Sequence, residues 1–149
     1  EVQALVCQTS FPMPRRTAVG TDYNRVNLLM AVLEKRMGMH LGTCDAYVNV
    51  AGGMRIVEPA LDLALVAALI SSHYGRSLDA HTVLFGEVGL VGEVRAVSQA
   101  ERRVQEALKT GYTTIILPEA NRQAIVKAGT IPLEGVKLVG IKHIRDLTI

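Results

Sequence analysis

The segment from Pro59 to Ser72 constrains the fold of this chain more than any other part of its sequence. It is apolar around nearly the whole circumference of a helix, and its proline stands where a first helical residue is favoured. Such a helix is stable only when other elements cover it on several sides. Its longest apolar run, 60–70, includes Asp62 and is shorter than the roughly 20 residues that cross a bilayer. We therefore expect a central helix in a domain with no membrane partner.

Short β-prone segments alternate with helical patterns along the rest of the chain. Apolar residues recur at helical spacing over 22–37, before Gly38, and again over 98–109 and 121–128. Strands are expected at 2–8, 15–19, 46–50, 82–88, 91–97, 113–117 and 136–141. This alternation predicts an α/β fold, with a mixed sheet and helices packed on it.

Composition and length indicate one packed domain that covers residues 1–149. Hydrophobic residues make up 49% of the 149 residues and charged residues 20%, which is typical of a globular core. The two cysteines, Cys7 and Cys44, lie in apolar strand-like segments and are expected to be structural thiols. The net charge of +2 is too small to indicate nucleic acid by itself. The start at Glu1, with no signal-type segment, is typical of a domain cut from a longer cytoplasmic protein.

The short motifs of the chain do not indicate a nucleotide, metal or serine-hydrolase site. Gly86, Gly89 and Gly92 lie between two predicted strands, which favours a tight hairpin over a phosphate-binding loop. No Gly-rich loop ends in Lys-Ser or Lys-Thr, and the four histidines lack metal-ligand spacing. No serine stands in a Gly-x-Ser-x-Gly elbow. We expect no cofactor and no metal within these residues.

Three blocks, in this order and spacing, resemble the peptidase domain of the Lon protease family over nearly the whole chain. They are Glu58-Pro59-Ala60 before the apolar helix, Gly86 to Val94 with its two Gly-Glu-Val triplets, and Ile115 to Asn121. The resemblance implies a Lon-type peptidase fold. It also implies that a Ser-Lys dyad would stand at Ala60 and Glu101.

Neither dyad position holds a residue that can catalyse acyl transfer. Ala60 has no hydroxyl, and Glu101 is a carboxylate in place of the lysine base. Ser98 and Glu101 instead form the Ser-x-x-Glu pattern of a helix capping box. The sequence therefore predicts a catalytically inactive relative of these peptidases, which is not an enzyme in this region.

A denser set of motifs resembles the carboxy-terminal domain of the RadA family of bacterial DNA-repair proteins. The motifs are Pro14-Arg15-Arg16, Thr21-Asp22-x-Asn24-Arg25, Ala31 to Arg36, Glu58 to Ala64 and Gly92 to Arg103. This resemblance implies a longer protein whose zinc motif and RecA-like ATPase lie outside these residues, with ATP, Mg²⁺ and Zn²⁺ as their cofactors. It also implies a homo-oligomeric, hexameric ring that acts on DNA in recombination, with the recombinase RecA as a partner.

Arginines supply the candidate DNA-contacting surface, which we predict from Arg15, Arg16, Arg95, Arg102 and Arg103, with Lys109 more peripheral. Ala100, Val104, Ala107 and Leu108 occupy the buried face of the third long helix, so its arginines are expected to face solvent. No aromatic residue accompanies them, which favours phosphate contacts over base stacking. The resemblance to the RadA family implies single-stranded or branched DNA as the partner. Two alternatives stay open: a peptidase with a rewired nucleophile, and a module that binds a peptide or small molecule in the vestigial cleft.

Asp62 is an acidic residue in the first turn of the apolar helix. The simpler interpretation is that its carboxylate accepts backbone amides at the positive end of the helix. The alternative is a buried ion pair with Arg55 or Arg95, across the space that the dyad would occupy.

Overall fold

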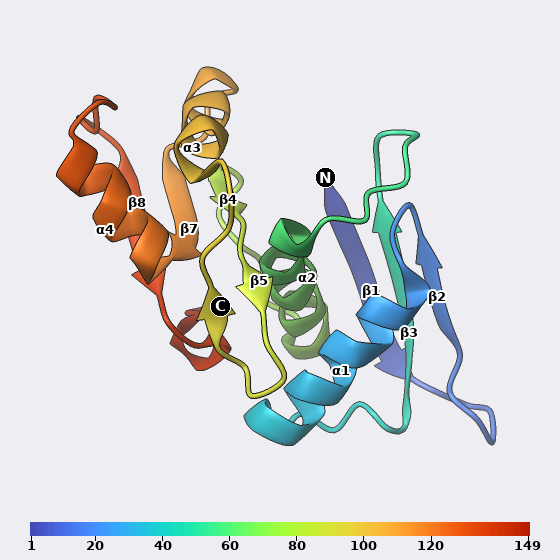
Figure 1. Cartoon of the computed structure of the whole chain (residues 1–149). Coiled ribbons are helices and arrows are strands. Elements are labelled where there is room, and N and C mark those ends of the chain that lie inside the picture. Colours follow the sequence, from blue (N-terminus) through green and yellow to red (C-terminus); the bar gives the residue numbers. More distant parts are fainter.

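The computed structural model describes all residues 1–149 and has four helices and three small sheets (Figure 1). The first sheet has the order β1-β3-β2 and contains β1 (Val2–Gln8), β3 (Cys44–Val50) and β2 (Arg16–Val19). The second has the order β4-β7-β8, all parallel, and contains β4 (Thr82–Leu84), β7 (Thr114–Pro118) and β8 (Lys137–Ile141). The third is the hairpin of β5 (Glu87–Val88) and β6 (Val94–Arg95). The prediction of a mixed α/β fold is confirmed, although the strands do not join into one sheet.

The helices are α1 (Tyr23–Met37), α2 (Asp62–Tyr74), α3 (Ala100–Lys109) and α4 (Glu119–Ala128). Short 3₁₀ turns stand at η1 (Pro59–Leu61) and η2 (Ile144–Asp146). Asp22 caps α1 by accepting a hydrogen bond from the Asn24 amide, and Gly38 ends it with φ 66°. Both boundaries follow from local chemistry, which explains why the sequence predicted them.

Helix α2 lies at the centre of the molecule, between β1 and β4 (Figure 1). Leu63, Val66 and Leu69 are fully buried, as the apolar circumference of this segment predicted. The helix runs past the expected end at Ser72 and stops at Gly75, which takes the left-handed conformation. No helix of the structure combines the length and the apolar character that a bilayer crossing requires.

The protein has two hydrophobic cores, and only the larger contains residues of α2. The larger has 18 buried residues, mainly from α1, α2 and β3, and it also includes Val88, Ile141 and Ile144, while the smaller has 8 and joins α3 and α4 to β7 of the second sheet. Only part of the thiol prediction is confirmed, because Cys44 is buried but Cys7 is exposed. Burial raises the pKa of the Cys44 thiol, as expected for an apolar site.

The expected strand over 82–88 is broken at Phe85 and Gly86. The Gly86 amide donates to the Ala60 carbonyl at 2.9 Å, and the Gly86 carbonyl accepts from the Leu63 amide at 3.0 Å. These bonds pull the chain out of the second sheet and towards the start of α2. The hairpin predicted around Gly89 is confirmed, since the Gly92 amide donates to the Gly89 carbonyl at 2.9 Å.

The capping box predicted at the start of α3 is wrong. The helix begins after Gln99, which has φ 61° and makes no side-chain cap. The Glu101 carboxylate accepts a hydrogen bond from the Thr130 hydroxyl instead of reaching back to Ser98. Because the cap position falls on Gln99, the Ser98-x-x-Glu101 spacing does not match the start of this helix.

Candidate functional site

The start of α2 holds Ala60, the first of the two dyad positions that the resemblance implies. Ala60 lies in the η1 turn with its side chain buried, and its carbonyl is held by the Gly86 amide. The segment from Pro59 to Leu63 is therefore fixed against the loop that leads into β5. A buried methyl group stands at the position where the resemblance would place a nucleophile.

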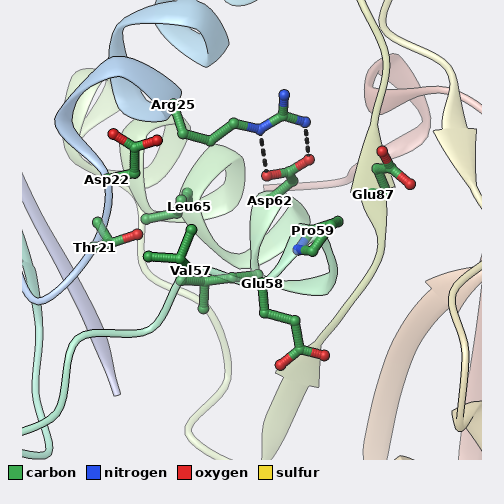
Figure 2. Close-up of a pocket in the computed structure, with 10 residues that line it drawn as sticks. Thr21, Asp22, Arg25, Val57, Glu58, Pro59, Asp62, Leu65 and Glu87 are labelled. Carbon is green, nitrogen blue, oxygen red and sulfur yellow. Dashed lines mark hydrogen bonds and ion pairs between the residues drawn. The ribbon is translucent and has the colours of Figure 1, made fainter.

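Next to Ala60, the buried Asp62 carboxylate forms an ion pair with the half-buried Arg25 of α1 (Figure 2). Arg25 Nε lies 2.9 Å from Asp62 Oδ1, and its Nη2 contacts Asp62 Oδ2 and donates to the Val88 carbonyl at 3.0 Å. The Val88 amide donates to Asp62 Oδ2 at 3.0 Å. The hydrogen bond with Asp62 raises the pKa of Arg25, partly opposed by burial. This network joins α1, α2 and β5.

The expected partners of Asp62 are wrong, and the favoured interpretation as a simple first-turn acid is incomplete. Arg55 lies 4.0 Å from the Asp22 carboxylate, and Arg95 lies 3.2 Å from that of Glu93. Arg25 was missed because it stands 37 residues from Asp62, on another helix. The signal in the sequence was the acid itself, because a carboxylate within an apolar helix needs a partner.

A small pocket of about 170 Å³ opens beside this ion pair (Figure 2). Its polar lining consists of Thr21, Asp22, Arg25, Glu58, Asp62 and Glu87. No Ser, Cys, Lys or His lines it, and the single side-chain hydroxyl of the lining is that of Thr21. The arrangement offers acidic groups but no activated nucleophile.

Helix α3 presents Arg103 to the start of α2, and Glu101 points elsewhere. The Arg103 guanidinium pairs with Glu58, directly before Pro59, and its Nε donates to the Ser98 carbonyl at 3.0 Å. Glu101 is held by Thr130 instead. Of the two dyad positions inferred from sequence, Ala60 lies at the expected helix start, whereas Glu101 does not face it.

The predicted arginine surface does not form one rim. Arg15 and Arg16 lie where β2 begins, on the opposite side of the molecule from α3 (Figure 1). The Arg15 guanidinium stacks over the Phe11 ring at 3.7 Å, and Arg16 donates to the Leu41 carbonyl at 3.0 Å. β2 pairs with β3 of the first sheet, whereas α3 packs on the core of the second sheet, so the fold separates the two groups.

The basic side chains on and near α3 differ in whether they already form ion pairs within the protein. Arg102 is exposed and makes no ion pair, while Arg103 is half-buried beside Glu58. Arg95 and Lys109 make exposed pairs, with Glu93 at 3.2 Å and Glu106 at 4.0 Å. The expectation that both Arg102 and Arg103 face solvent therefore holds for Arg102 alone.

Comparison with known proteins finds several relatives that carry the same name. The chain is 48% identical over 98% of its length to the DNA repair protein RadA of Halalkalibacterium halodurans, and 47% identical over 98% to that of Bacillus subtilis strain 168. It is 45% identical over 95% of its length to the DNA repair protein RadA of Synechocystis. The chain spans only about a third of the curated relatives, 31%, 31% and 26% of their lengths in the same order.

A domain family also matches most of the chain. The family model described as ChlI, subunit ChlI of Mg-chelatase, covers residues 15–121. The match begins before β2 and ends within α4, so it includes the start of α2 and the whole of α3. The chain belongs to the ChlI domain family, and its sequence is homologous to part of the bacterial DNA-repair proteins named RadA.

Proposed function

We propose that this domain is a non-proteolytic, Lon-like scaffold and DNA-contacting module of a DNA-repair protein. The names of its relatives support the repair context. The observation that carries the non-proteolytic part is the start of α2, where a buried methyl group occupies the nucleophile position at Ala60. The carboxylates on either side of it, Glu58 and Asp62, are both held in ion pairs with arginine.

In this proposal DNA phosphates bind first at the exposed face of α3. Arg102 has no competing partner, and exposed ion pairs such as Arg95–Glu93 contribute only about 0–1 kcal/mol, so a phosphate can displace the carboxylate. Arg103 and Lys109 extend this surface, while Arg15 and Arg16 form a second basic site at the β2 side. Two separated sites suit a single-stranded or branched DNA that passes around the domain.

Assembly belongs to the same proposal. Weak phosphate contacts in one subunit become strong when a homo-oligomeric ring, such as a hexamer, presents several copies to one DNA molecule. The longer protein would be a cytoplasmic DNA-dependent ATPase that works beside RecA. ATP, Mg²⁺ and Zn²⁺ would then belong to the other two thirds of its length, and this domain would hold no cofactor.

Fluorescence anisotropy with labelled single-stranded and forked DNA, over a series of salt concentrations, tests the surface. Arg102→Ala with Arg103→Ala should weaken binding for all sequences alike and flatten the salt dependence by about one unit per lost phosphate contact. Arg15→Ala with Arg16→Ala tests the second site, and Lys127→Ala with Lys137→Ala is the control with the same loss of charge. Light scattering with and without DNA reports assembly in the same samples.

One result would contradict the DNA surface. If the variant with all of Arg15, Arg16, Arg95, Arg102 and Arg103 changed to Ala assembles normally and keeps its affinity and salt slope, the domain is a scaffold without DNA contacts. Turnover of fluorescent casein by the unmodified protein would contradict the non-proteolytic part.

A further inference from the structure

Helix α2 carries one stripe that nothing in this chain covers. Leu61, directly before the helix, and Ala64 and Ala68 within it follow each other at helical spacing and are half-buried, whereas every other residue of 62–70 is buried. They form the floor of a mostly apolar groove of about 780 Å³. The groove is separate from the pocket beside Asp62, which opens on the other side of Leu61.

Two unpaired strand edges form the walls of this groove. β1 is an edge of the first sheet and β4 an edge of the second, and α2 lies between them (Figure 1). The Val6 amide points away from β3, since it donates to the Ser72 hydroxyl at 2.9 Å at one end of the groove. By the two-residue period of a strand, Val2 and Ala4 present their backbone groups to the same free edge.

β4 also presents backbone groups to the groove. The His81 carbonyl and the Phe85 amide bond to β7, so the backbone groups of Leu84, one residue earlier, point to the opposite edge. Unpaired backbone donors and acceptors at a strand edge are a template for a further strand. The small side chains of the floor leave room for that strand above α2.

The charges of the groove indicate what the strand carries. Glu1 and Asp79 are its only charged lining residues, and no Lys or Arg lines it. A basic residue of the occupant is therefore complementary in charge to the acidic rim. Apolar side chains of the occupant are complementary to the apolar floor.

We propose that this groove binds an extended peptide segment by strand addition to β1. Alternate small apolar side chains of the peptide face Ala64 and Ala68, and a Lys or Arg pairs with Asp79. Main-chain hydrogen bonds to β1 supply affinity, and the pockets along the floor select the side chains. This site is independent of the DNA surface on α3, and its occupant is an extended segment of a second protein.

The test uses a fluorescein-labelled octapeptide that alternates Val with Thr and carries one amino-terminal Lys. Anisotropy should show saturable binding with a Kd below about 1 mM. Ala68→Leu, which extends a side chain into the groove, should weaken binding tenfold or more. Ala31→Leu, at an exposed position of α1, is the matched control and should leave it unchanged.

Chemical changes in the peptide keep the test independent of protein stability. One version of the peptide is N-methylated at the Val amides and a second at the Thr amides, so each lacks the N–H donors along one edge of the peptide strand. At least one of the two versions should bind tenfold more weakly than the unmodified peptide. Asp79→Asn should weaken the Lys peptide but not a version with Gln in its place.

Three results would overturn this proposal. They are no binding by any peptide, equal binding by all N-methylated versions, and binding unaffected by Ala68→Leu. Sedimentation velocity addresses a second copy as the occupant: self-association that Ala68→Leu abolishes would assign the groove to a dimer and reject the peptide. DNA affinity measured on the same variants should stay unchanged, so failure here is distinguishable from failure of the DNA surface.

Discussion

At the scale of single residues, Asp62 is the side chain on which most of the local structure depends. It is buried, and it accepts hydrogen bonds from two elements, Arg25 of α1 and the Val88 amide of β5. A buried carboxylate is stable only when its charge and its lone pairs are satisfied. The ion pair therefore fixes how α1 and the hairpin approach the start of α2.

Replacement of Asp62 by Ala should lower the free energy of unfolding by about 3 kcal/mol or more, because it leaves Arg25 without its partner and the Val88 amide without an acceptor. Urea denaturation measures the change. Glu106→Ala, which removes an exposed pair with Lys109, is the control and should cost less than about 1 kcal/mol. A midpoint that Asp62→Ala leaves unchanged would show that the pair does not stabilise the fold.

Restoring the two dyad residues inferred from sequence should not produce a protease. In Ala60→Ser with Glu101→Lys, the new lysine starts from a position that faces Thr130, and a misplacement of about 1 Å can cost roughly 100-fold in rate. Ala60→Ser with Arg103→Lys places the amine on the side of α3 that faces Glu58. Any labelling of the introduced hydroxyl by a serine-reactive probe should appear in this second variant, and robust casein turnover by the first would contradict the argument.

At the scale of elements, the start of α3 shows how a helix forms without the cap that its sequence suggests. Gln99 holds the left-handed conformation without being glycine, and Ser98 makes no cap. Ser98→Ala should therefore change stability by less than about 0.5 kcal/mol. Asp22→Ala, at a cap that does form, should cost about 1 kcal/mol in the same urea assay. If Ser98→Ala and Asp22→Ala lower the free energy of unfolding equally, the capping-box prediction stands.

The first turn of α4 carries a pH-dependent pair. The hydrogen bond from Arg122 lowers the pKa of Glu119, partly opposed by burial. A carboxyl with a lowered pKa in the folded state stabilises the protein above its unfolded value of about 4.3, and the effect is lost as pH falls through the folded pKa. The melting-temperature difference between the protein and Glu119→Gln should therefore shrink from pH 7 to pH 3. Glu134→Gln, at an exposed position, controls for the loss of one charge.

At the scale of the whole molecule, two cores of different size imply two levels of stability. Val104 and Ala107 of α3 belong to the smaller core of 8 residues, and Val48 of β3 belongs to the core of 18. Regions with fewer buried apolar contacts open at lower free energy. Native-state hydrogen exchange should therefore give lower opening energies for the α3 amides than for those of β3. Identical values would show that the two halves unfold as one unit.

The sequence by itself determined the features that depend on neighbours along the chain. The boundaries of α1, the central place of α2, the hairpin at Gly89 and the absence of a hydroxyl at Ala60 follow from spacing, caps and residue type. The motif blocks indicated relatives among DNA-repair proteins named RadA, and the comparisons confirm that similarity.

Only the tertiary structure decided which distant residues meet. It paired Asp62 with Arg25, turned Arg103 and not Glu101 towards the start of α2, and separated Arg15 from Arg102. It also left the edges of β1 and β4 open on either side of Ala68. Such contacts join elements tens of residues apart, and their geometry depends on how whole helices and sheets pack, which no local pattern encodes.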